Sequence, residues 1–331
     1  MSDPQTSRSH LSGRHRQRGE RLSLRVVGIG VAILVLAAGA AVRLNMKAQP
    51  AAAAAGAAAG PEQVLEIHSA HGASFVPALE GRRPMFILAL GSDARPGEPP
   101  LRERSDSIHI IGVNFARRQA TILGFPRDSW VNIPGHGTAK ITTAMSSGGP
   151  ALTVATIERL MGIRIDFWIL TTFQGLTRMV DRLGPLKVRV VRPMHDRYSG
   201  ANFNPGVNRF HGTQALAFAR DRHDVPQGDI TRSADQGVLM MAALAKLHKD
   251  FARSAGSLFV WMLTGWQNVH TDLSPATILN LFLTATQIPL SHVNNRVVPA
   301  TTGSVGAQSV VFISPGAHAV FADMRADGIA R

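Results

Sequence analysis

The chain has 331 residues, of which 45% are hydrophobic and 17% charged, so it is long enough for one large globular domain or two small ones. It contains no cysteine, which excludes a disulfide framework, a thiolate zinc site and a cysteine nucleophile. The net charge of +13 invites a nucleic-acid-binding interpretation, but a genome that favours arginine produces the same excess, so charge alone does not decide the function.

The N-terminal segment predicts the compartment. Residues 1–25 are polar and rich in arginine, and an uncharged segment of seventeen residues follows and ends before Arg43. This length is at the short end for a membrane-spanning helix, so we expect residues 26–43 to be a single retained anchor in the cell membrane. The basic tail should stay in the cytoplasm, which places everything after the anchor outside. A cleaved signal peptide is the alternative, because the alanine-rich stretch 51–59 offers small residues for cleavage.

The exported part divides by composition. Residues 44–83 are expected to be an extracytoplasmic linker, because they begin with an alanine-rich segment of low complexity. Residues 84–250 should then form the core of the folded domain, and residues 251–331 the C-terminal part of the same domain.

Three apolar runs at the start of the folded part predict β-strands over residues 84–90, 107–114 and 119–126. The last two runs are separated by four residues, which is typical of a β-hairpin. If the turn centres on Ala116–Arg117, antiparallel pairing places Asp106 opposite Arg127. Because strand residues two apart share a face, Arg104 lies on the same side as Asp106. These polar side chains are therefore expected to converge at one end of a sheet.

The following pattern alternates helices with strands, which predicts an α/β domain in α-β-α layers. Helices are expected over residues 138–145, 150–162, 174–183, 213–220 and 229–247, strands over 165–171 and 186–191, and a loop over 192–211. On the longest predicted helix, apolar residues from Ile230 to Ala245 share one face. Asp229, Arg232 and Gln236 cluster on the other face near the N-terminal end, where free N–H groups and the helix dipole favour an anion.

Arginine repeatedly stands beside aspartate at the ends of these elements, in the segments GSDAR from residue 91, RSDS from 104, FPRD from 125, ARDR from 219 and GDITRSADQ from 228. A planar guanidinium binds two phosphate oxygens at once, and aspartate is a hard oxygen ligand of the kind Mg²⁺ prefers. Together they point to a substrate that carries two phosphates. Taken singly, each pair has a simpler explanation, either a surface ion pair contributing about 0–1 kcal/mol or, for Asp229, a helix N-cap.

The order and spacing of these segments, with IPG at 133–135 and Lys140 following FPRD and with VDRLG at 180–184, resemble the LytR–CpsA–Psr (LCP) family from about Pro84 to Leu247. This resemblance implies an extracytoplasmic phosphotransferase that moves a glycopolymer from a polyprenyl-pyrophosphate carrier onto peptidoglycan through a phosphodiester. It also implies an α-β-α domain whose central mixed sheet helps to enclose an apolar tunnel for the prenyl tail. We expect the tunnel to be lined by the inward faces of residues 85–90, 107–113, 150–161 and 230–245.

The resemblance further implies a role for each matching residue. Asp93 and Asp106 would hold Mg²⁺ or Mn²⁺. The pyrophosphate would be bound by Arg104, Arg127, Arg220, Arg222, Arg232 and Gln236, with Arg95 and Lys140 as more distant or glycan contacts. Arg127, Asp93 and Arg104 would carry catalysis, and Asp128 and Asp229 would support them. No general base is evident, and Asp93 is the candidate if it does not ligate the metal directly.

Three other functions remain open. A lipid-pyrophosphate hydrolase would use the same site with water as the acceptor, and a binding module would hold the lipid-linked glycan without reacting it. A membrane-tethered transcriptional regulator would explain the high charge, but the tail is short and shows no helix-turn-helix pattern, so we expect no nucleic-acid partner. The partners expected are the membrane, the lipid-linked glycan and peptidoglycan, while the identities of the glycopolymer and the acceptor sugar stay open. His109, within a predicted strand, is expected to be packed rather than catalytic.

Overall fold

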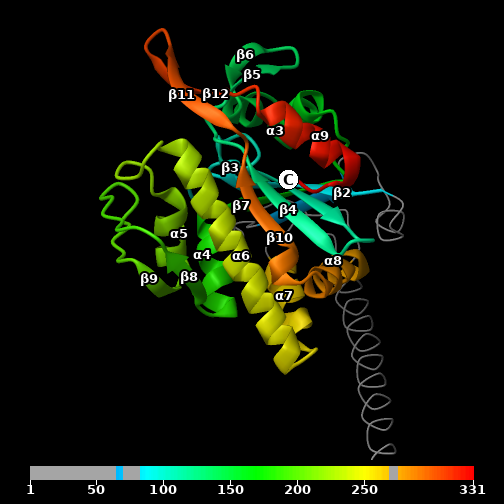
Figure 1. Ribbon diagram of the computed structural model, residues 1–331. Coiled ribbons are helices and arrows are strands. Elements are labelled where there is room, and N and C mark those ends of the chain that lie inside the picture. The colour runs from blue at the N-terminus through cyan, green and yellow to red at the C-terminus, as the bar shows by residue number, and fades with distance from the viewer. Residues whose placement is uncertain (1–64, 70–82, 268–274) are drawn as a thin grey trace, which may run out of the picture. The chain divides into compact units, whose positions relative to one another are not determined.

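The computed structural model describes residues 65–69, 83–267 and 275–331 (Figure 1). The predicted tail 1–25 and anchor 26–43 lie outside the described residues, as does most of the predicted linker. None of the helices within the described ranges combines the length and the apolar character needed to cross a bilayer.

A six-stranded mixed sheet forms the centre of the domain (Figure 1). Its strands lie in the order β1 (Leu65–Ser69), β7 (Phe167–Thr172), β2 (Met85–Ser92), β3 (Ser105–Asn114), β4 (Gln119–Gly124) and β10 (Val293–Val297). β2, β3 and β4 form an antiparallel meander, β7 and β10 join it in parallel, and β1 pairs antiparallel with β7. The predicted strands are therefore confirmed. The predicted linker 44–83 contains β1, which lies beyond its alanine-rich stretch and pairs with β7 in the central sheet.

Seven helices in the described residues surround this sheet. They are α3 (Thr142–Met161), α4 (Phe173–Leu183), α5 (Gly212–Arg220), α6 (Asp229–Arg253), α7 (Ser257–Trp266), α8 (Pro275–Gln287) and α9 (Ala317–Asp327), with a short 3₁₀ turn η1 (Leu290–His292) before β10. The sequence predicted two helices where α3 is continuous but kinked. Gly149 stands at the kink with φ of 67°, and Pro150, which follows it, cannot donate a helical hydrogen bond.

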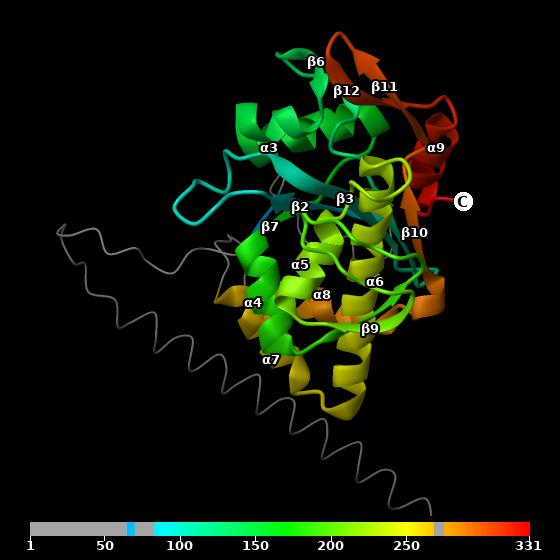
Figure 2. The same ribbon diagram turned by 90° about the vertical axis from the view of Figure 1, so that its left-hand side faces the viewer.

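The two faces of the sheet are covered by different helices, as the two-residue period of β2 requires. Phe86, Leu88 and Leu90 point into a core shared with α3 and α9. Met85 and Ile87 point the other way, into a core shared with α8. α6 packs on this second face against β3, β4 and β10, and α4, α5 and α7 pack around it. The predicted α-β-α layering is thus present, with α3 and α9 on one side and α6 and α8 on the other (Figure 2).

Three small antiparallel hairpins lie outside the central sheet. They are β5 (Trp130–Ile133) with β6 (Gly137–Lys140), β8 (Leu186–Val190) with β9 (Gly206–Phe210), and β11 (Ala300–Val305) with β12 (Gln308–Ile313). Two predictions are corrected here. Residues 137–140 form a strand instead of the start of a helix, because Gly135 and Gly137 at positive φ turn the chain back onto β5. The predicted loop 192–211 contains β9, which pairs with β8.

Candidate active site

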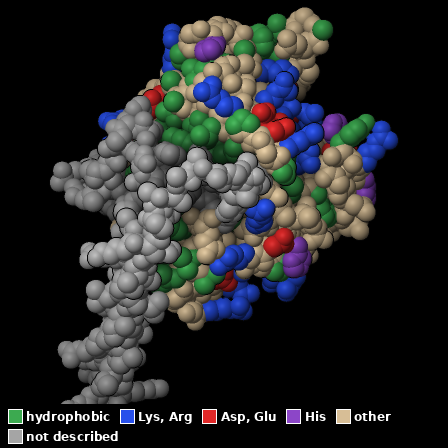
Figure 3. Space-filling view, turned by 180° about the vertical axis from the view of Figure 1, so that it is seen from behind, with side chains coloured by type: hydrophobic (Ala, Val, Ile, Leu, Met, Phe, Trp, Pro, Cys, Tyr) green, Lys and Arg blue, Asp and Glu red, His purple; other side chains and the backbone are tan. Residues whose placement is uncertain are grey.

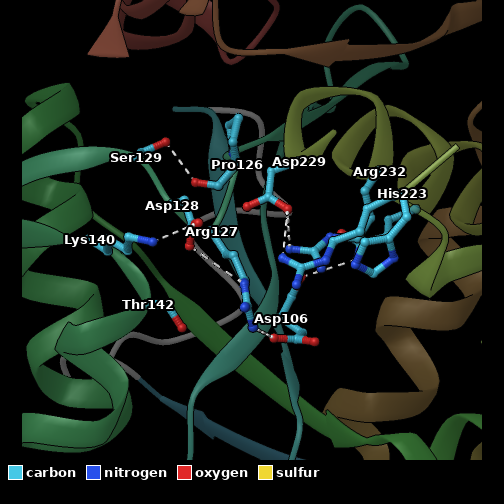
Figure 4. A network of polar contacts seen from close by, with 12 residues as sticks. Asp106, Pro126, Arg127, Asp128, Ser129, Lys140, Thr142, His223, Asp229 and Arg232 are labelled. Atoms are coloured by element: carbon cyan, nitrogen blue, oxygen red, sulfur yellow. Dashed lines mark hydrogen bonds and ion pairs between the residues drawn. The ribbon is translucent and has the colours of Figure 1, made fainter. Parts of the chain in front are cut away.

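The β3–β4 hairpin brings Asp106 and Arg127 together. Its register pairs His109 with Gly124, and Phe125 N–H continues the pairing by donating to the Ile108 carbonyl at 2.8 Å. The same register sets Asp106, within β3, opposite Arg127, which follows β4, and the Arg127 guanidinium contacts the Asp106 carboxylate there (Figure 4). The predicted pairing of these two residues is confirmed. Both side chains are largely shielded from water, at 15% and 13% exposure, so their charges are weakly screened.

The loop after Arg127 is braced on several sides. Asp128 accepts a hydrogen bond from Lys140 Nζ at 2.8 Å, and Ser129 Oγ donates to the Pro126 carbonyl at 2.7 Å. Thr142 N–H donates to the Arg127 carbonyl at 3.1 Å, at the start of α3. Asp128 and Lys140 therefore hold the backbone that carries Arg127 (Figure 4). Lys140, expected as a more distant or glycan contact, is thus paired with Asp128.

The N-terminal turn of α6 supplies the second part of the cluster. Asp229 lies 2.9 Å from Arg232 and 3.7 Å from Arg222, so one carboxylate serves two guanidinium groups. Arg232 is buried, and burial lowers the pKa of its guanidinium against the opposing attraction of Asp229. Gln236, one turn later, donates from Nε2 to the backbone carbonyls of Asp106 at 3.2 Å and Ala219 at 3.0 Å. Gln236 thereby joins β3 to α5 beneath the charged groups.

The face of α6 that packs inward differs from the expected one. The buried residues of α6 include Arg232, Ser233, Asp235 and Gln236, whereas residues such as Ile230 and Val238 on the expected apolar face are only half-buried. Three of these buried polar side chains have partners in the fold. Arg232 pairs with Asp229, Asp235 pairs with Arg192, and the Gln236 amide donates to the Ala219 carbonyl. Burial of polar groups is tolerated where such partners exist.

Asp93 lies close enough to Asp106 for their charges to interact. Burial, and then the negative charge of Asp106, raise the pKa of the Asp93 carboxyl, although the charge of Arg127 opposes the shift. The backbone N–H of Asp93 donates to the Arg104 carbonyl at 3.0 Å, which fixes the loop that carries it. Two neighbouring carboxylates whose repulsion raises a pKa fit a divalent cation, because the cation would remove that repulsion. No group of three or more His, Asp or Glu side chains suited to a metal occurs in the described residues, so further ligands would have to come from phosphate and water.

The remaining predicted arginines are placed differently. Arg220 stacks over the Phe173 ring at 4.9 Å from its centroid and has no carboxylate partner within the described residues. Arg104 is exposed on the loop before β3, and its side chain forms no ion pair with a described residue. Arg95 is also exposed, and the structure does not bring its side chain into the cluster. Among the described residues, neither Arg104 nor Arg220 has a carboxylate counterion.

An apolar cavity of about 280 Å³ opens beneath this cluster, on the α6 side of the sheet. Its walls come from β2, β3, β7, α4, α5, α6 and Trp261 of α7, including Ile169, Met179, Leu216, Leu239 and Ala243. Asp106, Arg220 and Gln236 line it as well. The expected lining is confirmed for parts of β2, β3 and α6, and it is wrong for residues 150–161. These belong to α3, which packs on the opposite face of the sheet.

Two residues of the site, Asp221 and Phe173, were not predicted to have a role. Asp221 lies between Arg220 and Arg222, is fully buried, and neither of its carboxylate oxygens has a hydrogen-bond partner in the described structure. Burial raises its pKa to about 8, helped by the neighbouring Asp224, so the side chain is largely neutral at pH 7 and leaves both flanking arginines their full charge. Phe173, whose ring stacks against the Arg220 guanidinium, is the first residue of α4 and directly follows β7. The ARDR segment signalled Asp221, but nothing in the sequence signalled Phe173.

The comparison with known proteins agrees with this geometry. The profile of the LytR_cpsA_psr family matches residues 44–323. The chain belongs to this family. The regulatory protein MsrR of Staphylococcus aureus is 33% identical to this LytR_cpsA_psr chain over 156 residues, 46% of each protein. The polyisoprenyl-teichoic acid–peptidoglycan teichoic acid transferase TagU of Bacillus mycoides is 34% identical over 193 residues, which are 58% of this chain and 61% of TagU. The chain thus spans about half the length of the first of these curated relatives.

Solved structures establish the fold of this LytR_cpsA_psr member. Protein gbs0355 from Streptococcus agalactiae superposes with a TM-score of 0.66 at 23% identity, covering 77% of this chain and 91% of that one. The family protein YwtF (TagT), solved with bound octaprenyl pyrophosphate lipid, superposes with a TM-score of 0.57 at 22% identity, covering 80% of this chain and 94% of that one.

Proposed function

We propose that this chain transfers a glycopolymer from a polyprenyl-pyrophosphate carrier to a hydroxyl group of peptidoglycan. The observation that carries the proposal is that Asp106, Arg220 and Gln236 line the apolar cavity and also belong to the charged cluster. One ligand that is apolar at one end and polyanionic at the other would fill both spaces. The name of TagU and the lipid bound to YwtF support this choice of ligand.

The reaction needs little covalent chemistry from the protein. The acceptor hydroxyl oxygen would form a bond to the phosphorus that carries the glycan, and the bond from that phosphorus to the bridging oxygen would break. Polyprenyl monophosphate would leave with the bond electrons, and the hydroxyl proton would pass to a base, for which Asp93 is the candidate only if it does not ligate the metal directly. Arg104, Arg127 and Arg220 would balance the charge on the phosphate oxygens. Such electrostatic stabilisation, together with positioning, supplies most of the rate enhancement in phosphoryl transfer.

A divalent cation belongs to this proposal as an expectation. Asp93 and Asp106 would hold Mg²⁺ or Mn²⁺, which supplies neutralisation of the pyrophosphate charge when it is bound. The raised pKa of Asp93 supports the assignment, because a cation would keep both carboxylates ionised.

The cell location is likewise proposed. We place the anchor at residues 26–43, with the basic tail in the cytoplasm and the described domain outside. A reporter enzyme that is active only outside the cytoplasm, fused at the C-terminus, should be active in cells that make the chain. A fusion active only in the cytoplasm would instead favour a membrane-tethered regulator.

The direct test supplies the purified full chain with a polyprenyl-pyrophosphate-linked glycan, labelled in the sugar, together with uncrosslinked peptidoglycan. Transfer predicts label in the peptidoglycan as a phosphodiester and one polyprenyl monophosphate for each attached glycan. Label that appears only as free glycan phosphate would establish the hydrolase. Lipid that is bound but unchanged would establish the binding module.

A further inference from the structure

Helix α7 is apolar on its outer face as well as on its inner face. Residues 257–266 contain no charged side chain. Trp261 and Met262 pack inward, whereas Val260 and Leu263, one turn apart on the opposite side, are 48% and 41% exposed. A surface helix normally carries polar side chains on its outer face. α7 has only 10 residues, so it can lie on a bilayer surface but cannot cross one.

A group of cations borders this helix. Lys246, Lys249 and Arg253 lie on consecutive turns of the C-terminal part of α6, which packs against β8, the strand of Lys187. The neighbouring positive charges, that of Arg253 first, lower the pKa of the Lys249 ammonium. Lys187 and Arg209 face each other across the β8–β9 pair. Lys246 is paired with Asp250 at 3.0 Å, while the other four have no ion pair within the described residues. The face of the domain seen from behind likewise shows more Lys and Arg than Asp and Glu side chains (Figure 3).

The cations and α7 form one surface at one end of the domain. Asp250 links them, because it pairs with Lys246 and accepts a hydrogen bond from Trp261 Nε1 at 3.2 Å. Both ribbon views place α7 and the C-terminal end of α6 at the end of the domain opposite the β5–β6 and β11–β12 hairpins (Figures 1 and 2). Trp261 also lines the apolar cavity, so the cavity reaches toward this end.

We propose that Val260 and Leu263, together with Lys187, Arg209, Lys249 and Arg253, form a docking surface for a bilayer rich in anionic phospholipid. The apolar side chains enter the headgroup region and the cations face the lipid phosphates, which is the arrangement of an interfacial amphipathic surface. This contact holds the end of the cavity near Trp261 at the membrane, so that a polyprenyl chain passes from the apolar interior of the bilayer into the apolar cavity. The inference goes beyond the proposed function, and its test does not measure transfer.

The test uses the absence of cysteine from the chain. The full-length Val260→Cys variant carries an environment-sensitive fluorophore and is reconstituted into vesicles of phosphatidylglycerol and phosphatidylcholine with a nitroxide on the acyl chain. The emission should shift to the blue and be quenched by the nitroxide. The matched label at Ser304→Cys, exposed on the β11–β12 hairpin at the other end, should show neither change. Equal responses at the two positions would overturn the proposal, and so would a blue shift at Val260→Cys without quenching, which would indicate a protein partner or a second copy.

Charge is tested separately. Neutralising Lys187, Lys249 and Arg253 with glutamine should lower the ratio of docked to undocked chains roughly 100-fold, because each surface cation contributes about a factor of five on an anionic bilayer. Neutralising the exposed Arg102, Arg159 and Arg164 changes the net charge equally and should leave the quenching intact. Quenching that survives the first triple substitution, or that is equal in pure phosphatidylcholine, would refute the anionic-lipid assignment.

Discussion

The arginines of the site differ in how they are neutralised. Arg127, Arg222 and Arg232 have carboxylate partners, so each must exchange or share a partner when phosphate arrives. Arg104 and Arg220 have none in the described structure and are free to bind phosphate without that exchange. The neutral state of Asp221 at pH 7 preserves this excess of positive charge. The cluster is therefore poised for an anion with more than one charge.

We expect Arg127→Lys to lower kcat/KM by about 30- to 1,000-fold, which corresponds to about 2–4 kcal/mol of lost transition-state stabilisation. Lysine retains the charge but loses the planar fork that holds two oxygens. Release of polyprenyl monophosphate measures the effect. Arg118→Lys, at the exposed turn of the same hairpin, is the control and should retain full activity. Equal activity of the two variants would mean that the cluster acts only as a diffuse positive surface.

Removal of divalent cations is expected to stop the reaction, and added Mg²⁺ to restore it. Asp93→Asn should raise the Mg²⁺ concentration needed for half-maximal rate, because one of the two proposed carboxylate ligands is lost. The measurement is a metal titration of product release by the wild type and the variant. A rate that ignores chelation would remove the metal assignment and leave the arginine cluster unaffected.

At the scale of elements, β3 and α6 are joined through a neutral histidine. His109 is fully buried, receives a hydrogen bond from Ser107 Oγ at 3.1 Å and donates from Nε2 to the Ser233 carbonyl at 3.1 Å. Gly124 permits this approach, since a Cβ there would lie 2.3 Å from Ser233 Oγ and 2.9 Å from His109 Nε2. The strand that carries Asp106 and the helix that carries Arg232 are thus fixed to each other.

This join predicts a pH dependence of stability. Burial lowers the pKa of His109 from 6.5 to about 4, so between these values the unfolded chain takes up a proton that the folded chain does not. The free energy of unfolding should therefore fall as the pH falls from 6.5 to 4, by up to about 3 kcal/mol. Denaturant titrations at several pH values measure this, and His109→Gln should remove that part of the slope. The exposed His318→Gln variant should keep it, and an unchanged slope in His109→Gln would refute the assignment.

The sequence predicted the elements that depend on local pattern and missed those that depend on distant partners. The pairing of Asp106 with Arg127 follows from the length of one turn and the antiparallel rule, so the amino-acid sequence is sufficient to predict it. The inward face of α6 is different, because Asp235 is buried through Arg192, which is 43 residues away in the sequence. The contact between Arg220 and Phe173 similarly joins two segments that only the tertiary fold brings together.

For the whole molecule, the cavity and the charged cluster should act as one substrate site. Ala243 lines the cavity, so Ala243→Phe would fill part of the space proposed for the prenyl tail. We expect kcat/KM for long-chain substrates to fall by about 5- to 150-fold, as overpacking costs about 1–3 kcal/mol, while a substrate with one or two isoprene units is little affected. Ala245→Phe, on the same helix but outside the cavity lining, is the control. Equal losses on short and long substrates would show that the cavity does not hold the tail.

The length of α6 has a consequence for the energetics of turnover. From Gln236, under the charged cluster, to Arg253, at the proposed docking surface, the helix runs for seventeen residues, or about 26 Å. If α6 stands upright on that surface, a pyrophosphate bound beside Gln236 would lie well above the headgroups, and in the proposed reaction the first isoprene units would have to leave the bilayer before any bond is broken. The apolar cavity offsets the hydration of those units, which would otherwise cost about 25 cal/mol for each Å² exposed. Under this proposal, partial extraction of the lipid from the membrane would be a step of the catalytic cycle, and turnover would be sensitive to how firmly the surrounding bilayer retains the prenyl chain.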